Sequence, residues 1–96
     1  MIIYRFTQLD EQQKAQIHRL WNEEYPINLK GRFSILLNET NNHRHFIIQN
    51  KENVIIAWSV LFENDGQERF SIIVSSKSKG LGYGKLLLDE MKKAVP

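Results

Sequence analysis

Three of the five glycines in this sequence, Gly80, Gly82 and Gly84, lie within a span of five residues. They follow the apolar segment 72–74 and precede the leucine run 86–88. A strand, a glycine-rich loop and a helix in this order can bind phosphate, because the first N–H groups of a helix have no intrahelical acceptor. Glycines let an anion approach those groups closely. The spacing therefore predicts an anion site where the last helix begins.

Two common phosphate-binding motifs do not fit this spacing. A P-loop requires a glycine where Lys79 stands, and a hydroxyl residue where Leu86 stands. A dinucleotide fingerprint places its third glycine one residue later than Gly84. An ordinary strand-to-helix turn stays open as an alternative, although one glycine would suffice for it.

The segment Lys79-Gly80-Leu81-Gly82-Tyr83-Gly84 resembles the acetyl-coenzyme A (acetyl-CoA) loop of the GNAT family of N-acetyltransferases, usually written Q/R-x-x-G-x-G/A. The resemblance extends to the strand before the loop, to the leucines after it and to the order of elements from residue 1. Lys79 departs from the usual Arg or Gln, and Ser76 from a frequent proline. The resemblance implies an acyl-CoA N-acyltransferase-like fold that transfers an acetyl group from acetyl-CoA, its co-substrate, to a primary amine.

By this resemblance, the backbone amides of the loop hold the pyrophosphate, and lysines at its rim add positive charge. The backbone of the preceding strand pairs with the pantetheine arm as an added strand would. The implied coenzyme-binding residues are Ile73, Val74, Lys79, Gly80, Leu81, Gly82, Tyr83, Gly84 and Lys85.

Acetyl transfer to an amine requires a neutral amine, so a general base is expected. Glu68 begins the strand that leads to the loop, where some family members carry a base glutamate, and Glu63 is a weaker candidate. A glutamate next to a turn is also commonly a solvated residue. Two further groups are considered, the histidines His18, His43 and His45, and the aromatic residues Trp21, Tyr25, Phe33, Trp58 and Phe62.

The histidines have no accompanying carboxylate or cysteine cluster, so surface or edge positions and no metal site are expected. Trp21, Trp58 and Phe62 are expected in the core. Trp21, Tyr25 and Phe33 could instead shape an acceptor pocket, with core the favoured interpretation for Trp21.

Hydrophobic periodicity predicts the elements that must position these residues. Strands are expected over 2–6, 45–49, 54–62 and 68–75, and helices over 10–24, shortly after Gly31, and over 82–94. Asp10 with Gln13 predicts a capping box, and Asn64-Asp65-Gly66 a tight turn. The polar segment 38–45 is expected to be a loop. The order β-α-α-β-β-β-α predicts an α+β domain with a mixed, mainly antiparallel sheet, strand 54–62 at its centre and helices flanking it.

Residues 1–96 are expected to form a single domain that lacks the strand-helix-strand part following the coenzyme helix in family members. In many family members that part supplies a tyrosine that acts as an acid toward the thiolate, and no residue of this chain matches that tyrosine. Strand 68–75 should then be an uncovered edge. Two explanations stay open: the chain is a fragment of a longer enzyme, or a second chain pairs with the edge, as in a homodimer.

The net charge of +2 comes from 13 basic and 11 acidic residues that are interspersed, which disfavours nucleic-acid binding. No signal peptide or membrane-spanning segment is evident, so a cytoplasmic protein without a membrane partner is expected. The absence of cysteine excludes disulfides and thiolate chemistry. The expected partner is a small-molecule or peptide amine, and its identity cannot be read. The alternative function is a non-catalytic module that binds CoA or a protein partner through the exposed edge.

Overall fold

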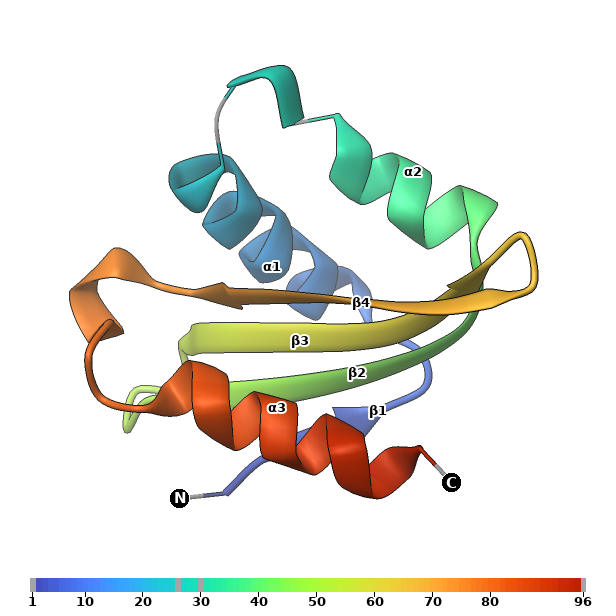
Figure 1. The fold of residues 1–96 in the computed structure, drawn as a ribbon. Helices are drawn as coiled ribbons and strands as arrows, with labels where there is room; N and C mark the ends of the chain where they lie inside the picture. Colours follow the sequence, from blue (N-terminus) through green and yellow to red (C-terminus); the bar gives the residue numbers. More distant parts are fainter. Residues whose placement is uncertain (1, 26, 30, 96) are drawn as a thin grey trace.

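A computed structural model describes residues 2–25, 27–29 and 31–95 and shows one antiparallel sheet flanked by helices (Figure 1). The strands lie in the order β1-β2-β3-β4, and each neighbouring pair is antiparallel. This confirms the predicted α+β class. The elements are β1 (Tyr4–Phe6), α1 (Glu11–Glu24), a short 3₁₀ turn (Ile27–Leu29), α2 (Arg32–Glu39), β2 (Asn41–Gln49), β3 (Ile55–Asn64), β4 (Gln67–Val74), a second 3₁₀ turn (Ser76–Ser78) and α3 (Tyr83–Ala94).

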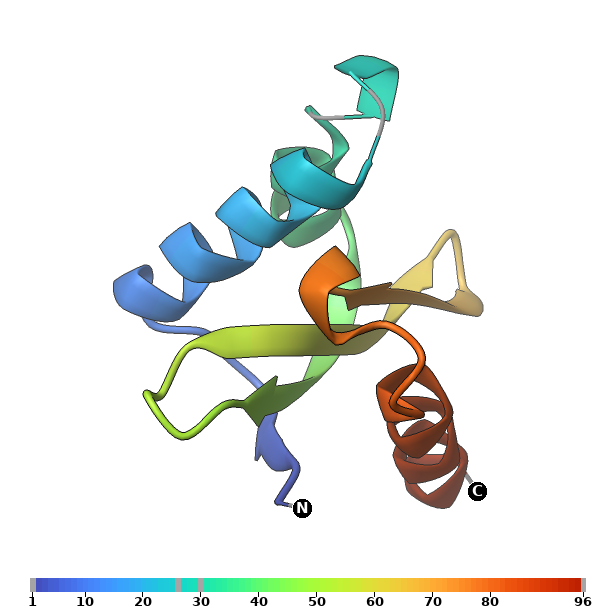
Figure 2. The same cartoon turned by 90° about the vertical axis from the view of Figure 1, so that its left-hand side faces the viewer.

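The helices cover opposite faces of the sheet. Helices α1 and α2 lie over one face and α3 lies over the other (Figures 1 and 2). Side chains alternate between the two faces along each strand, so β3 contributes Trp58 and Val60 to the first face, and Ala57 and Leu61 to the second. Strand β3 is buried along most of its length, which confirms the prediction of a covered central strand.

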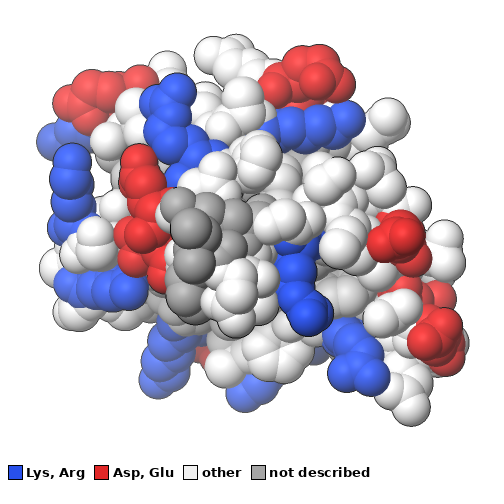
Figure 3. All heavy atoms as spheres, turned by 90° about the horizontal axis from the view of Figure 1, so that it is seen from above, with Lys and Arg blue, Asp and Glu red and all other residues white. Residues whose placement is uncertain are grey.

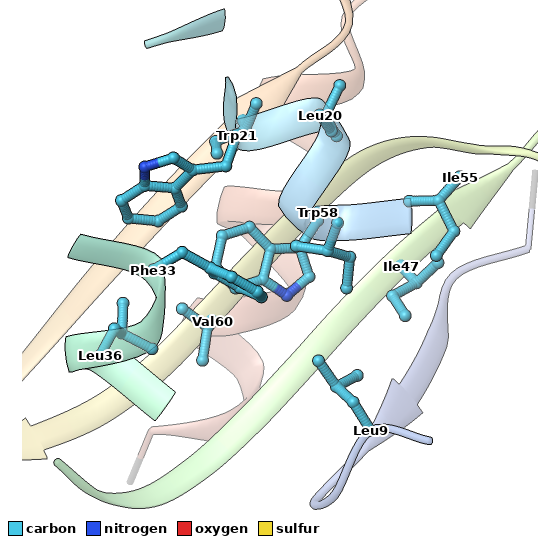
Figure 4. Close-up of a cluster of buried hydrophobic side chains, with 11 residues drawn as sticks. Leu9, Leu20, Trp21, Phe33, Leu36, Ile47, Ile55, Trp58 and Val60 are labelled. Atoms are coloured by element: carbon cyan, nitrogen blue, oxygen red, sulfur yellow. The ribbon is translucent and has the colours of Figure 1, made fainter. Parts of the chain in front are cut away.

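The core beneath α1 and α2 is built around aromatic rings (Figure 4). Trp58 is fully buried, and its ring centroid lies 6.0 Å from that of Trp21 and 5.8 Å from that of Phe33. Ile17 and Leu20 of α1 and Ile47 of β2 join this cluster, and Phe62 packs against it while partly buried. Trp21, Trp58 and Phe62 are therefore core residues, as predicted.

The second core lies between the sheet and α3. Leu87 and Met91 are buried one helical turn apart and contact Phe46, Ile48 and Leu61 of the sheet. This is the apolar stripe that the helical periodicity predicts.

The start of α1 is fixed by the predicted capping box. Asp10 Oδ1 accepts the Gln13 N–H at 2.7 Å, and Gln13 Oε1 accepts the Asp10 N–H at 2.9 Å. These two bonds satisfy donors that the first helical turn leaves without partners. The box therefore fixes where α1 begins.

The expectation of a loop over 38–45 is wrong. Helix α2 continues through Glu39, and β2 begins at Asn41. Asn41 lies opposite Glu63 and Arg44 opposite Leu61, with a register shift between them and a positive φ of 55° at Asn42. Pairing with β3 therefore overrides the low strand propensity of the asparagines, and an irregularity absorbs the misfit.

Strands β3 and β4 form a hairpin, which the Asp65-Gly66 turn closes with φ values of 53° and 76°. Both residues are in the left-handed region that such two-residue turns require. No strand among the described residues pairs with the outer side of β4, so β4 is an edge strand of the sheet that these residues form. Apart from the start of β2, the predicted ends of the strands differ from the observed ones by one or two residues, because periodicity marks an element better than its limits.

Candidate functional site

The glycine loop connects β4 to α3 and adopts a conformation that two of its glycines make possible. Gly80 has φ 85° and Gly82, the N-cap of α3, has φ 82°. A residue with a Cβ is strained at such angles. Gly84 has no positive φ, and a Cβ added there would meet Val74 Cγ2 at 3.8 Å, an ordinary contact. Gly80 and Gly82 are thus required by the backbone, whereas Gly84 is not.

The first turn of α3 presents N–H groups without intrahelical acceptors. The first bond of the helix runs from the Leu86 N–H to the Gly82 carbonyl at 3.0 Å, so the N–H groups of Tyr83, Gly84 and Lys85 precede it. No acidic residue lies in this turn, and Gly82 offers no side-chain cap. The partial positive charge of the helix start is therefore not neutralised locally, which suits an anionic ligand.

A residue that the sequence analysis did not single out holds the beginning of this loop. Glu24, at the end of α1, accepts the Ser76 N–H on Oε2 at 2.9 Å and pairs its Oε1 with Lys79 Nζ at 3.1 Å. Burial raises the pKa of the Glu24 carboxyl, but the bonds from Ser76 and Lys79 outweigh this and the pKa is lowered. The partners are more than fifty positions apart in the chain, so no local pattern indicates the contact.

The hairpin register decides which backbone groups of β4 point outward. Asn64 and Gln67 flank the two-residue turn as a hydrogen-bonded pair, and the pattern alternates from there. The Ser75 N–H bonds to the Ile56 carbonyl at 2.8 Å, which agrees with this alternation. The outward N–H and C=O groups belong to Glu68, Phe70, Ile72 and Val74.

This register corrects one expectation about the coenzyme arm. Val74 can offer its backbone to a ligand, as the resemblance implies. Ile73 cannot, because its N–H and C=O face Trp58 on β3 and its side chain is buried in the core. Ile72 takes its place, since the next outward pair along the edge after Val74 is that of Ile72.

The two glutamates considered as bases lie at the far end of β4 from the glycine loop. Glu68 stands opposite Glu63 in the register, pairs with Arg44, and is about 20 Å along the strand from Val74. Asn42 Nδ2 donates to Glu63 Oε2 at 2.8 Å. These residues line a cavity of about 700 Å³. The structure does not bring either carboxylate to the loop, and the role of Glu68 as a base stays a prediction.

All three histidines line a groove of about 790 Å³ between α1, α2 and β2. His45 is buried, contrary to the expectation of a surface or edge residue, because its ring packs against Trp58. The Trp58 indole N–H donates to His45 Nδ1 at 3.0 Å. Burial, and secondarily the charge of His43, lowers the pKa of His45 to about 4, so the ring is neutral at pH 7. No group of three or more potential metal ligands occurs in residues 2–25, 27–29 and 31–95.

The aromatic residues of the first helices divide into two kinds. Trp21 and Phe33 are buried in the core. Tyr25 is only partly buried, and its hydroxyl lies 3.3 Å from Ser71 Oγ on the edge strand. Tyr25 therefore places a polar group beside β4, and Phe33, although buried, lines the groove that holds the three histidines.

The surface carries mixed charges. Viewed from the side of α1 and α2, basic and acidic residues are interspersed and neither sign forms a continuous patch (Figure 3). No helix in the described part of the chain is long and apolar enough to cross a membrane.

Solved structures with a similar fold are acetyltransferases. A mutant of the spermidine N-acetyltransferase SpeG from Vibrio cholerae aligns over 95% of this chain with a TM-score of 0.60 and 18% identity. A chimera of the Vibrio cholerae enzyme and hSSAT aligns equally well, with a TM-score of 0.60, 20% identity and 95% coverage. This chain has the GNAT acyltransferase fold.

The similarity is one of fold, since the sequences are distant. The chain spans about three fifths of the length of these two structures. No protein-family model matches the sequence, and no curated protein sequence matches it. The fold has β4, the glycine loop and α3 in the order that the resemblance implies.

Proposed function

We propose that this chain binds acetyl-CoA through its glycine loop and belongs to an N-acetyltransferase that acts on a primary amine. The observation that carries the proposal is the start of α3, where two left-handed glycines lead an edge strand into unpaired helix N–H groups. This arrangement lies within an acyltransferase fold. An ordinary turn would require neither the second left-handed glycine nor the open edge beside it.

The residues present fit the two polar parts of acetyl-CoA. The N–H groups of Tyr83, Gly84 and Lys85 would hold the pyrophosphate, with the Lys85 ammonium nearby in sequence adding positive charge. The outward backbone groups of Val74 and Ile72 would pair with the amides of the pantetheine arm, as a peptide strand pairs with a sheet edge. Acetyl-CoA supplies an activated thioester to the acceptor amine.

The Lys79 ammonium has a different role from the one implied for it. The Lys79 ammonium pairs with Glu24 Oε1 at 3.1 Å, so it already has a partner within the protein. We assign it to shaping the loop, while its backbone N–H stays available to the pyrophosphate.

The acceptor is proposed to be a small amine. Both structural neighbours carry the name of a spermidine N-acetyltransferase, which makes polyamines the first compounds to test. Glu68 stays a candidate base, and its pairing with Arg44 must open for it to accept a proton. Because acetyl-CoA is the co-substrate, we propose a cytoplasmic location.

The test of this function is release of the CoA thiol from acetyl-CoA with a panel of amines that includes polyamines, aminoglycosides and peptide N-termini. Turnover above the acetyl-CoA hydrolysis background supports the proposal. Protection against thermal unfolding by CoA without turnover limits the chain to coenzyme binding. The absence of both overturns the proposal.

A second candidate function, association through the β4 edge, is favoured by Phe70. Its side chain is 58% exposed and lines an apolar cavity of about 430 Å³ between β4 and the end of α3. A second copy of this chain, pairing β4 with β4 about a two-fold axis, would cover Phe70 and the outward backbone groups at once. Such a dimer would occupy the edge proposed for the pantetheine arm, so CoA and dimerisation should compete.

A further inference from the structure

The hydroxyl groups of Tyr25 and Ser71 lie 3.3 Å apart where the end of α1 meets the edge strand. Tyr25 is held from two sides. Its backbone N–H bonds to the Trp21 carbonyl at 2.9 Å, and its ring packs edge-on against the Trp21 indole with centroids 4.6 Å apart. The residue just before it, Glu24, is bonded to Ser76. The end of α1 is thereby fixed against both the middle and the end of β4.

One of the two hydroxyl donors of Tyr25 and Ser71 is not used in the contact between them. Each hydroxyl carries one O–H, and only one of the two can be used between them. The second O–H finds no acceptor among the described residues, since neither hydroxyl forms another hydrogen bond there. Both residues are only partly buried, so this O–H is available to a ligand that lies along the edge.

The position of the pair matches the reach of the coenzyme arm. This step rests on the proposed function. From the pyrophosphate to the sulfur, the pantetheine arm has the backbone length of about four residues, or ~14 Å when extended. The first turn of α3 lies beside Val74, since a Cβ on Gly84 would meet Val74 Cγ2 at 3.8 Å, and Ser71 lies three positions before Val74, or about 10 Å along the strand. A thioester whose arm follows the edge from the loop therefore ends beside residues 70–72.

We propose that the Ser71 O–H is donated to the Tyr25 oxygen, and that the Tyr25 O–H left free donates a hydrogen bond to the oxygen of the acetyl thioester. When the amine lone pair forms the new C–N bond, the carbonyl electron pair moves onto that oxygen, and the O–H stabilises the resulting negative charge. The carbonyl then re-forms and the C–S bond breaks, its electron pair leaving on sulfur. The nitrogen loses one proton to water and the thiolate takes one from water, so the step is balanced.

The test uses acetyl-CoA labelled with ¹³C at its carbonyl and needs no acceptor. A hydrogen bond to the oxygen moves the ¹³C resonance of the bound thioester downfield from that of free acetyl-CoA. Tyr25→Phe should lose that shift while CoA still raises the melting temperature. Tyr4→Phe, on the opposite edge strand β1, is the matched control and should keep the shift. With an amine acceptor, Tyr25→Phe should lower kcat about 100-fold with little change in the KM for acetyl-CoA.

Two results separate the failure of this inference from the failure of the proposed function. A bound carbonyl resonance that is the same in Tyr25→Phe and in the unmodified chain overturns the role of the pair and leaves coenzyme binding intact. The absence of both CoA protection and turnover in the unmodified chain overturns the proposed function, and the inference with it. Ser71→Ala adds a second measurement, and a downfield shift reduced relative to the unmodified chain supports the pairing of the two hydroxyls.

Discussion

Glu24 accepts the backbone N–H of Ser76 at 2.9 Å, so the end of α1 holds the residue with which the loop before α3 begins. The same carboxylate pairs with Lys79 one residue before Gly80. The Glu24 side chain is only 9% exposed, whereas that of Lys79 is 60% exposed. The bond to Ser76 is therefore the less screened of the two and should contribute more to stability.

Replacing Glu24 with Ala should lower the free energy of unfolding by about 1.5 kcal/mol, because a charged hydrogen bond is lost and the Ser76 N–H is left unpaired. It should also weaken CoA binding by loosening the loop. Urea denaturation and a CoA titration measure the two effects. Glu23→Ala is the matched control, since Glu23 is exposed on the same helix. Equal effects from both substitutions would contradict the anchoring role.

Gly82→Ala should destabilise the chain by about 1 kcal/mol, because alanine is strained at a φ of 82°. It should also abolish the protection that CoA gives, since the strain moves the first N–H groups of α3. Gly84→Ala should instead stabilise the helix by about 0.5 kcal/mol and keep CoA binding, because its new methyl meets Val74 at an ordinary distance. Thermal unfolding with and without CoA tests both variants. Loss of CoA protection in Gly84→Ala but not in Gly82→Ala would contradict the conclusion that the backbone requires Gly82 and not Gly84.

Folding stability should fall as the pH drops from 7 to 5, and His45 should account for most of the loss. Its pKa is about 4 in the folded chain, because burial disfavours the charged ring, and about 6.5 when unfolded. The unfolded state thus binds more protons below pH 6.5, and stability present above that pH is lost on acidification towards pH 4. The expected loss between pH 7 and 5 is about 2 kcal/mol.

His45→Gln should flatten this pH dependence, while the exposed His18→Gln should keep it. The pKa of Glu24 is lowered from 4.5. The stability that Glu24 contributes is therefore lost below pH 4.5, outside the range of pH 7 to 5 in which His45 acts. Urea denaturation at several pH values provides the measurement. An unchanged pH dependence in His45→Gln would show that the buried ring is not the group responsible.

Phe70→Lys should suppress association of the chain at high concentration if β4 pairs with a second copy, because a charged side chain on an edge opposes strand addition. The matched control is Phe62→Lys at a position packed against the core, where loss of stability and not loss of association is expected. Sedimentation velocity at several concentrations, with and without CoA, gives the result. A monomer under all conditions would exclude the dimer, and a dimer unaffected by CoA would contradict competition for the edge.

The sequence predicts the local elements of the site well and their long-range contacts poorly. The glycine loop, the Asp10–Gln13 capping box and the Asp65-Gly66 turn each depend on residues that are close in the chain. The Glu24–Ser76 and Tyr25–Ser71 contacts join residues about fifty positions apart, which periodicity does not relate. The start of β2 is unpredictable from sequence for the same reason, since Asn41 becomes a strand residue only through its pairing with β3.

Whether a backbone group of β4 points toward β3 or toward the open edge likewise depends on the register of the hairpin. Ile73 and Val74 are adjacent in sequence, yet only Val74 presents its N–H and C=O at the edge. The sequence shows that one of the two must do so, and the position of the turn decides which.

The central claim, that the glycine loop binds the pyrophosphate of CoA, is tested most directly by thermal unfolding of the chain with 1 mM CoA, a concentration chosen to exceed a Kd of about 10 μM a hundredfold. Such binding would stabilise the folded chain by about 2.7 kcal/mol and raise its melting temperature by several degrees. That rise is expected for the unmodified chain and for Gly84→Ala, and none is expected for Gly82→Ala. A folded chain whose melting temperature does not change with CoA would contradict the central claim.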